Sequence, residues 1–189
     1  MRKLLLVILI LTYSNSLLSQ EAKGKVSEKE LAFFANTYIS ALKAKDSEKL
    51  TPILFKKEEI IDFFATNIKE RKLSSQWTEM ISDDWSEILE EIRTEFLKAY
   101  KTDLNNRKTD WGSAKILHLK TEEVASFITD EIKYQLVIIV YKDAKNYGIL
   151  MVNSCFRYKG KIKIYKGEVN NISMTKDQYK NLLTRMNNE

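Results

Sequence analysis

Few side chains in this sequence are of the kinds that usually do chemistry. His118 is the only histidine and Cys155 the only cysteine, and a histidine-based metal site or catalytic triad needs more partners than that. Both residues stand in segments with a strand-like pattern. This placement favours structural roles, as a satisfied polar residue at His118 and a small core residue at Cys155. We therefore expect no metal site and no cofactor.

Other candidate catalytic groups are equally isolated. Ser154 lacks the flanking glycines of a nucleophile elbow, and the sequence has no glycine-rich phosphate-binding loop. Asp62 and Asp84 fall on expected helices, where acidic side chains are usually solvated. Because no acid–base pair stands out, the preferred prediction is a non-enzymatic protein. A small-molecule isomerase or hydrolase-like enzyme stays open as a further alternative.

The N-terminus has the composition of an export signal. Arg2 and Lys3 precede an apolar run over residues 4–11, which is too short to cross a hydrocarbon layer about 30 Å thick. The pattern predicts a signal peptide over 1–19, a short exposed segment over 20–26 and a single domain over 27–189. We expect a periplasmic or secreted protein with no stable membrane anchor after cleavage. The alternatives are a retained anchor and a buried N-terminal helix.

Charge argues against nucleic acid as a partner. The chain carries 31 basic and 26 acidic residues, a net charge of +5, which falls to +3 when Arg2 and Lys3 leave with the signal peptide. The two signs are interspersed rather than collected in a basic stripe, so we expect no nucleic-acid binding. With a single cysteine, the domain must be held together by packing and not by an internal disulfide.

The first half of the chain has helical periodicity. Ser27 and Glu30 have the spacing of a capping box at the start of the first helix, and Asp46 has the features of a cap for a second, short helix. The apolar spacing predicts the further helices, with a break over 73–76, to span 48–55, 57–69 and 78–105.

In the second half the period changes to that of strands. Alternation and β-branched content predict strands over 115–120, 133–142, 147–158 and 161–166, while 121–130 fits either a bulged strand or a helical turn. Short connections predict two successive hairpins, and Thr175 begins a short C-terminal helix. The expected fold class is therefore α+β, with N-terminal helices packed on a curved antiparallel sheet.

The two hairpins, with Asp143 opposite Asn146 and Tyr158 opposite Lys161, divide the strand residues into two faces. The face that contains Leu136 is the better candidate for packing on the helices. The other face is also apolar, whereas a free face of an antiparallel sheet carries alternating polar residues. We expect a second copy of the protein to cover it, in a homodimer through Val137, Ile139, Leu150, Val152 and Phe156. The alternatives are coverage by the C-terminal helix or by the N-terminal segment.

Two stretches resemble NTF2-like domains of the cystatin-like superfold. Residues 31–46 read LAFFANTYISALKAKD and resemble the opening amphipathic helix, with its small-residue and Asp step. Residues 155–165 read CFRYKGKIKIY and resemble the closing hairpin. The helical middle over 56–104 is longer than in a minimal domain of this kind, and Ile162 replaces the aromatic residue that often follows the turn.

The resemblance implies a curved sheet wrapped around helices as a cone with a pocket. Such domains include isomerases, dehydratases, small-molecule binders and protein-interaction modules, so the fold alone does not give the function. Because pockets combine aromatic side chains with a few polar groups, we expect this one to be lined by Tyr38, Trp85, Tyr134, Asn153 and Arg157. The expected function is an exported module that binds a small ligand or a protein partner. The alternative is a periplasmic inhibitor or immunity-type protein.

Overall fold

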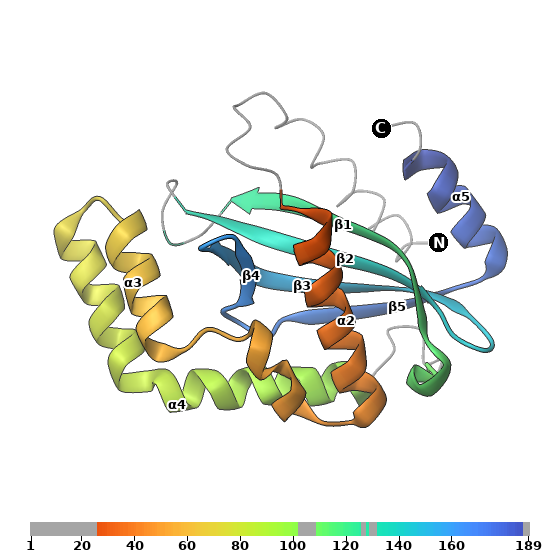
Figure 1. Ribbon diagram of the computed structural model, residues 1–189, viewed down its shortest axis with the longest axis horizontal. Helices are drawn as coiled ribbons and strands as arrows, with labels where there is room; N and C mark the ends of the chain where they lie inside the picture. Colours follow the sequence, from red (N-terminus) through yellow and green to blue (C-terminus); the bar gives the residue numbers. More distant parts are fainter. Residues whose placement is uncertain (1–25, 102–108, 126–127, 129–131, 187–189) are drawn as a thin grey trace.

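The computed structural model describes residues 26–101, 109–125, 128 and 132–186. The expected signal peptide and nearly all of the expected 20–26 segment lie outside these residues. The fold is α+β, with helices packed on a curved antiparallel sheet and a short helix at the C-terminal end, as expected (Figure 1). None of the helices in the described ranges is long and apolar enough to cross a membrane.

The helical half follows the expected order, with shifted boundaries. Its elements are α2 (Glu28–Ala44), the 3-10 helix η2 (Ser47–Ile53), α3 (Lys57–Asn67), α4 (Arg71–Lys101) and the 3-10 turn η3 (Trp111–Ser113). The break expected over 73–76 is wrong, because α4 already begins at Arg71. The hydroxyl groups of Ser75 and Thr78 donate back to the carbonyl oxygens of Arg71 and Ser75, at 3.0 and 2.9 Å. They therefore sit inside a helix and do not cap its start.

The sheet is an antiparallel meander whose last strand is split in two. Its strands are β1 (Lys115–Ala125), β2 (Lys133–Lys142), β3 (Tyr147–Tyr158), β4 (Lys161–Ile164) and β5 (Val169–Met174), followed by α5 (Lys176–Met186). Strands β4 and β5 both pair with β3, so they lie end to end along the edge of β3 that faces away from β2. β5 was not expected from the sequence. β1 continues through residues 121–125, so this part of the segment that fitted either a strand or a helical turn is a strand.

Both expected hairpins are confirmed. The backbone N–H of Asp143 donates to the carbonyl oxygen of Asn146 at 2.9 Å, which closes the β2–β3 turn. Tyr158 lies opposite Lys161 across the β3–β4 turn. In that turn Lys159 and Gly160 both adopt positive φ, at 46° and 79°, as a two-residue type I′ turn requires.

A bulge at Ser154 reverses the alternation along β3. Val137 lies opposite Val152, but Gln135, two residues away on β2, lies opposite Cys155, three residues away on β3. Ser154 has a left-handed backbone with φ of 56°, and its carbonyl oxygen accepts the N–H of Tyr165 at 3.0 Å. Since β3 gains one residue here, Cys155 points to the same face as Val152.

The helices cover the face of the sheet opposite to the one expected. The inner face, which includes Val137, Ile139, Leu150 and Val152, packs on α2, on η2 and on the last turns of α4. The outer face, which includes Leu136, Ile138, Val140, Ile149 and Met151, packs with Tyr179 and Leu182 of α5. The assignment of the Leu136 face to the N-terminal helices is therefore wrong. Both faces are apolar, so alternation alone could not distinguish them.

The five residues expected at a dimer surface belong to the interior of one chain. Val137, Ile139, Leu150 and Val152 have no exposed surface and lie in the core cluster beneath α2. Phe156 is equally buried in a second cluster, where its ring stacks on that of Phe63 with centroids 4.6 Å apart. This expectation is corrected, because the helices of the same chain already occupy the position proposed for a second copy.

Truncation of one of these side chains tests the correction. Leu150→Ala should lower the free energy of unfolding by about 2–5 kcal/mol, because it opens a cavity in the core. Leu97→Ala, on the exposed side of α4 where the leucine is 40% exposed, should change it by less than about 1 kcal/mol. Urea denaturation of both variants makes the comparison. Equal costs would mean that Leu150 is not a core residue.

Candidate functional site

Three of the five residues expected to line a pocket are side chains of the core. Tyr38 on α2 packs edge-on against Phe96 of α4, with ring centroids 5.7 Å apart. Its burial raises the pKa of the Tyr38 hydroxyl well above the ordinary value. Tyr134 stacks on Phe156 with centroids 4.8 Å apart, and Trp85 packs against the same aromatic cluster. Tyr38 therefore lies in one cluster, and Trp85 and Tyr134 in another.

The other two expected pocket residues belong to the irregular part of β3. Asn153 and Arg157 are half-buried, and the backbone N–H of Asn153 donates to the carbonyl oxygen of Glu168 at 2.9 Å, beside the Ser154 bulge. The structure does not gather the five residues around one cavity. The inner face of the sheet is instead filled by side chains from α2, η2 and α4.

The two residues singled out for their chemistry lie apart. Cys155 is fully buried, and burial raises the pKa of its thiol, so it stays protonated and shielded. His118 is exposed on β1, with its ring centroid 6.4 Å from that of Tyr179 on α5. Within the described ranges, no three His, Cys, Asp or Glu side chains form a group that could hold a metal ion.

The surface does carry a groove, formed where η2 returns alongside α2. The groove has a volume of about 680 Å³ and is open to solvent. Helix α2 contributes four side chains in successive turns, which are Phe33, Asn36, Thr37 and Ser40. The other wall comes from η2, with Glu48, Lys49, Thr51 and Pro52.

A tight helical stop makes the groove. Lys45 ends α2 in the left-handed conformation, with φ of 57°. Its N–H and that of Asp46 donate back to the carbonyl oxygens of Leu42 and Ala41, which closes the helix in a Schellman-like arrangement. The Asp46 carboxylate then accepts the N–H of Glu48 at 3.0 Å and starts η2 at once. With so short a connection, the two helices must lie against each other.

A buried lysine anchors the far end of η2 to the sheet. The side chain of Lys163 on β4 is only 8% exposed. Its ammonium donates to the carbonyl oxygens of Leu54 and Pro52 at 3.0 and 3.5 Å, and lies 3.2 Å from the carboxylate of Glu59. An ammonium group has three N–H donors, so these partners satisfy it completely. Lys163 therefore acts as a structural clamp between β4, η2 and α3.

Two carboxylates on α3 complete this clamp. Partial burial works to raise the pKa of Glu59, but the hydrogen bond from the Lys56 N–H and the Lys163 ammonium outweigh it, so the pKa lies below its ordinary value. Asp62, one turn later, accepts a hydrogen bond from the Tyr158 hydroxyl at 2.6 Å and pairs with Lys159 at 3.1 Å. These two contacts also lower the pKa of Asp62. Asp62 thus ties α3 to the β3–β4 turn.

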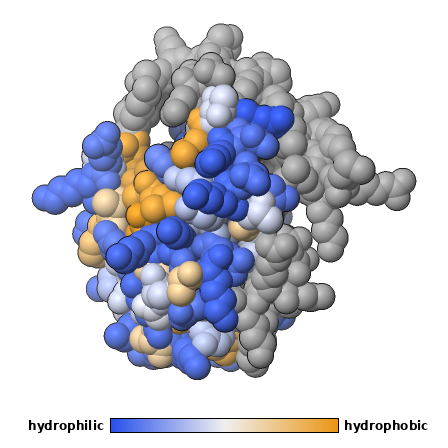
Figure 2. Space-filling view, turned by 90° about the vertical axis from the view of Figure 1, so that its right-hand side faces the viewer, coloured by the Kyte–Doolittle hydropathy of each residue, from blue (hydrophilic) through white to orange (hydrophobic). Residues whose placement is uncertain are grey.

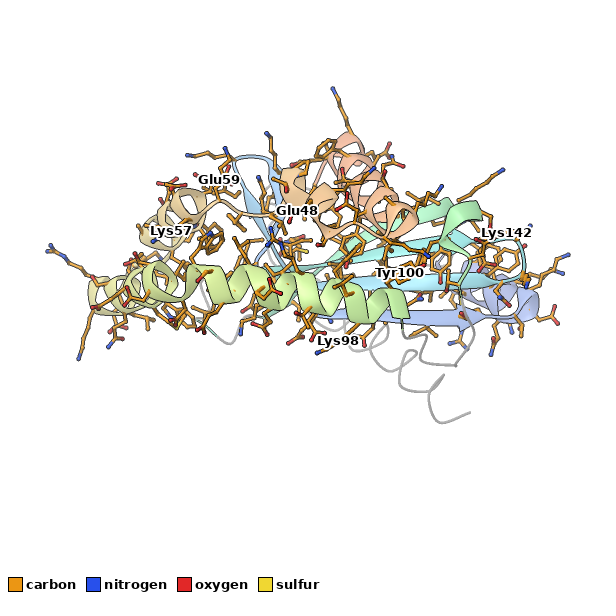
Figure 3. All side chains as sticks on the ribbon, turned by 90° about the horizontal axis from the view of Figure 1, so that it is seen from below. Glu48, Lys57, Glu59, Lys98, Tyr100 and Lys142 are labelled. Atoms are coloured by element: carbon orange, nitrogen blue, oxygen red, sulfur yellow. The ribbon has the colours of Figure 1, made fainter. Side chains whose placement is uncertain are left out.

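The groove combines apolar and polar side chains that are suited to binding. The carboxylate of Glu48 forms an ion pair with Arg93 of α4, with Oε1 and Nη2 2.7 Å apart. Figure 3 shows Glu48 on η2 and Glu59 on α3, both above α4. Phe33 and Pro52 give an apolar contact surface, and Asn36, Thr37, Ser40 and Thr51 give neutral hydrogen-bonding groups.

Comparisons with known proteins assign no family to this chain. No protein-family model, no curated protein and no solved structure matches it. The groove is therefore the basis for inferring function.

Sequence reasoning missed the groove, although Phe33 gave a signal for it. The buried stripe of α2 includes Leu31, Phe34, Ala35 and Tyr38, while Phe33 falls between these positions and is 53% exposed. A large aromatic residue on the polar side of an amphipathic helix marks a possible contact surface.

The carboxylate of Glu59 makes the clamp dependent on pH. Its pKa is lower in the folded than in the unfolded chain, so its stabilising effect is present above about pH 4.3 and is lost as the pH falls through the folded pKa. Glu59→Gln should therefore lower the free energy of unfolding by about 1–2 kcal/mol near pH 7. The difference from wild type should shrink as the pH is lowered from 7 towards 3, because protonation of Glu59 removes the charge that distinguishes the two side chains.

Urea denaturation across this pH range measures the effect. Glu58→Gln is the matched control, because Glu58 is the exposed neighbour of Glu59 and should change stability by less than about 0.5 kcal/mol. A Glu59→Gln deficit that is the same at pH 7 and pH 3 would show that the ion pair with Lys163 is not its cause.

Proposed function

We propose that this chain is a non-enzymatic binding module that holds a protein partner in the groove between α2 and η2. In keeping with the expected signal peptide, the partner would be met outside the cytoplasm. A protein that caps or inhibits another protein is one form of this function.

The openness of the groove is the observation that carries the proposal. A site for a small molecule typically buries about 70–90% of its ligand, and a groove open to solvent on one side cannot enclose a ligand to that extent. A protein segment needs no such enclosure, because the rest of the partner covers it. The filled inner face of the sheet also favours a protein partner over the small ligand that the sequence left open.

The lining of the groove suits an extended segment of polypeptide. Phe33 is a rigid anchor that is already 53% exposed, and aromatic anchors often dominate binding energy at protein interfaces. The amide of Asn36 can donate to and accept from a peptide group at the same time. Since η2 is held by the Lys163 clamp and by Arg93, the walls lose little conformational freedom on binding.

The buried ionisable groups support a non-enzymatic function. The three donors of Lys163 are all engaged by protein acceptors. Tyr38 and Cys155 are core side chains whose pKa values are raised by burial, so neither offers an activated nucleophile. The order of helices followed by an antiparallel meander supports the NTF2-like resemblance as part of this proposal, since such domains include protein-interaction modules.

Selection of peptides on the purified protein tests the proposal. A random peptide library displayed on phage is panned on the wild type, and the affinities of the enriched peptides are measured by fluorescence anisotropy. Phe33→Ser should weaken them at least about tenfold, which corresponds to about 1.4 kcal/mol of binding free energy. The stability of the variant should change by less than about 0.5 kcal/mol, because the side chain is exposed.

A matched control distinguishes binding in the groove from non-specific binding to exposed apolar side chains. Met80 on α4 is a large apolar residue that is 39% exposed and does not line the groove, so Met80→Ser should leave the affinities unchanged. Peptides that bind the Phe33→Ser variant as well as the wild type would refute the proposal.

A further inference from the structure

Strand β1 lies at one edge of the sheet. In the sheet order β1-β2-β3-β4, its only partner among the described strands is β2. Its register with β2 shifts between Ile116 and His118 and is then continuous from His118 to Ala125. A long, regular edge of this kind presents backbone N–H and C=O groups that another strand can pair with.

The surface of β1 is also unusually open. Leu117 and Val124 are 36% and 45% exposed. Figure 2 views the side of the molecule on which β1 begins, where the surface is largely hydrophilic with a few hydrophobic residues.

Charge divides β1 into two halves of opposite sign. Lys115 and Lys120 lie in its first half, and Glu122 and Glu123 lie in its second half. Lys120 and Glu122 share a face, with Nζ and Oε1 3.1 Å apart. Two copies of the strand placed antiparallel, with Thr121 opposite its own copy, bring Lys120 of each opposite Glu122 of the other. The strand is therefore complementary in charge to a second copy of itself.

We propose that β1 is the interface of a homodimer in which two β1 strands pair antiparallel about a two-fold axis at Thr121. A two-fold axis that relates neighbouring antiparallel strands runs perpendicular to the sheet, so the residue on the axis faces its own copy. With Thr121 on the axis, Lys120 faces Glu122 of the partner subunit, and Glu122 faces the partner subunit's Lys120. Threonine pairs and opposite charges are both favourable cross-strand neighbours.

The neighbouring registers are excluded by the same charges. An axis at Lys120 places two lysines directly opposite each other, and an axis at Glu122 places two glutamates opposite each other. Parallel pairing in register sets each charge beside its own copy. Like charges directly opposite are destabilising, so the sequence of β1 selects antiparallel pairing at Thr121.

The proposed interface differs from the dimer expected from the sequence. That expectation rested on an apolar sheet face, which the helices of the same chain cover. Lys120 and Glu122 pair with each other within one chain, and in the proposed dimer each also lies opposite a charge of the other sign on the second copy. Pairing at this edge joins two sheets into one.

Charge reversal tests the register. Lys120→Glu and Glu122→Lys each place like charges across both symmetric pairs, so each should raise the dimer dissociation constant at least about tenfold. The double variant Lys120→Glu/Glu122→Lys exchanges the charges and should restore wild-type dimerisation. Sedimentation velocity of the purified protein up to about 100 µM measures the dissociation constant, and circular dichroism checks that each variant is folded.

A cross-linking experiment tests the axis independently. Directly opposite residues in an antiparallel pair have Cα atoms about 4.5–5.5 Å apart, within the span of a disulfide. Thr121→Cys should therefore give mostly covalent dimer on mild oxidation, because the natural Cys155 is buried. Ser86→Cys, at an exposed position on α4, is the control and should stay monomeric.

Three results would overturn the proposal. These are a wild-type protein that is monomeric at about 100 µM, a double variant that fails to recover the dimer lost in both single variants, and Thr121→Cys cross-linking no faster than Ser86→Cys. If the wild-type protein is monomeric, the β1 edge would instead be available to pair with a strand of a different protein.

Discussion

The single extra residue at Ser154 is the constraint on which the rest of the structure depends. Without it, β3 would continue its alternation, and Cys155 would point away from the helices. With it, Cys155 joins Val152 on the inner face, and Ile162 and Ile164 of β4 lie in the same core cluster as Leu50, Ile53 and Leu54. This contact includes an isolated parallel bridge between Leu54 and Ile164. The bulge therefore positions the segment that forms one wall of the groove.

The same reversal sends Phe156 to the other core. There it packs with Phe55, Phe63 and Phe64, which come from α3 and the residue segment before it. The irregular residue thus directs Cys155 to the core beneath α2 and Phe156 to the core beside α3, while Ile149 and Met151 of the same strand pack with α5. Lys163, opposite Phe156 on β4, lies where the two cores meet, and this explains why a charged group is buried there. Its three acceptors compensate for the loss of water.

Local signals in the sequence were sufficient for the parts of the fold that depend on local chemistry. The Ser27 cap, the Asp46 cap and the turn at Asp143 are set by hydrogen bonds between residues only two or three positions apart. The cap at Thr175 is of the same kind, since its hydroxyl accepts the N–H of Gln178 at 3.3 Å. Such contacts need no knowledge of the distant chain, and they were predicted correctly.

What could not be predicted depends on contacts between distant segments. Both sheet faces are apolar, so which face packs on the N-terminal helices depends on contacts between segments that are distant in the sequence. The bulge was hidden because Ser154 is not a residue that favours positive φ. β5 was missed because Asn170 and Asn171 do not favour strands, yet Asn171 is buried and accepts the hydroxyl of Tyr141 at 2.8 Å. That hydrogen bond joins residues 30 positions apart, and periodicity cannot reveal it.

The two proposed surfaces are physically compatible because they use different layers of the fold. The groove lies on α2 and η2, which cover the inner face of the sheet, while β1 is available through its edge. A two-fold axis perpendicular to the sheet keeps both inner faces on the same side, so pairing through β1 would present two grooves in the same direction. A partner that carries two copies of the recognised segment would then bind the second groove at a high effective concentration, provided that its linker spans the distance between the grooves. Weak binding in one open groove is sufficient in such an arrangement, because avidity and not enclosure supplies the affinity.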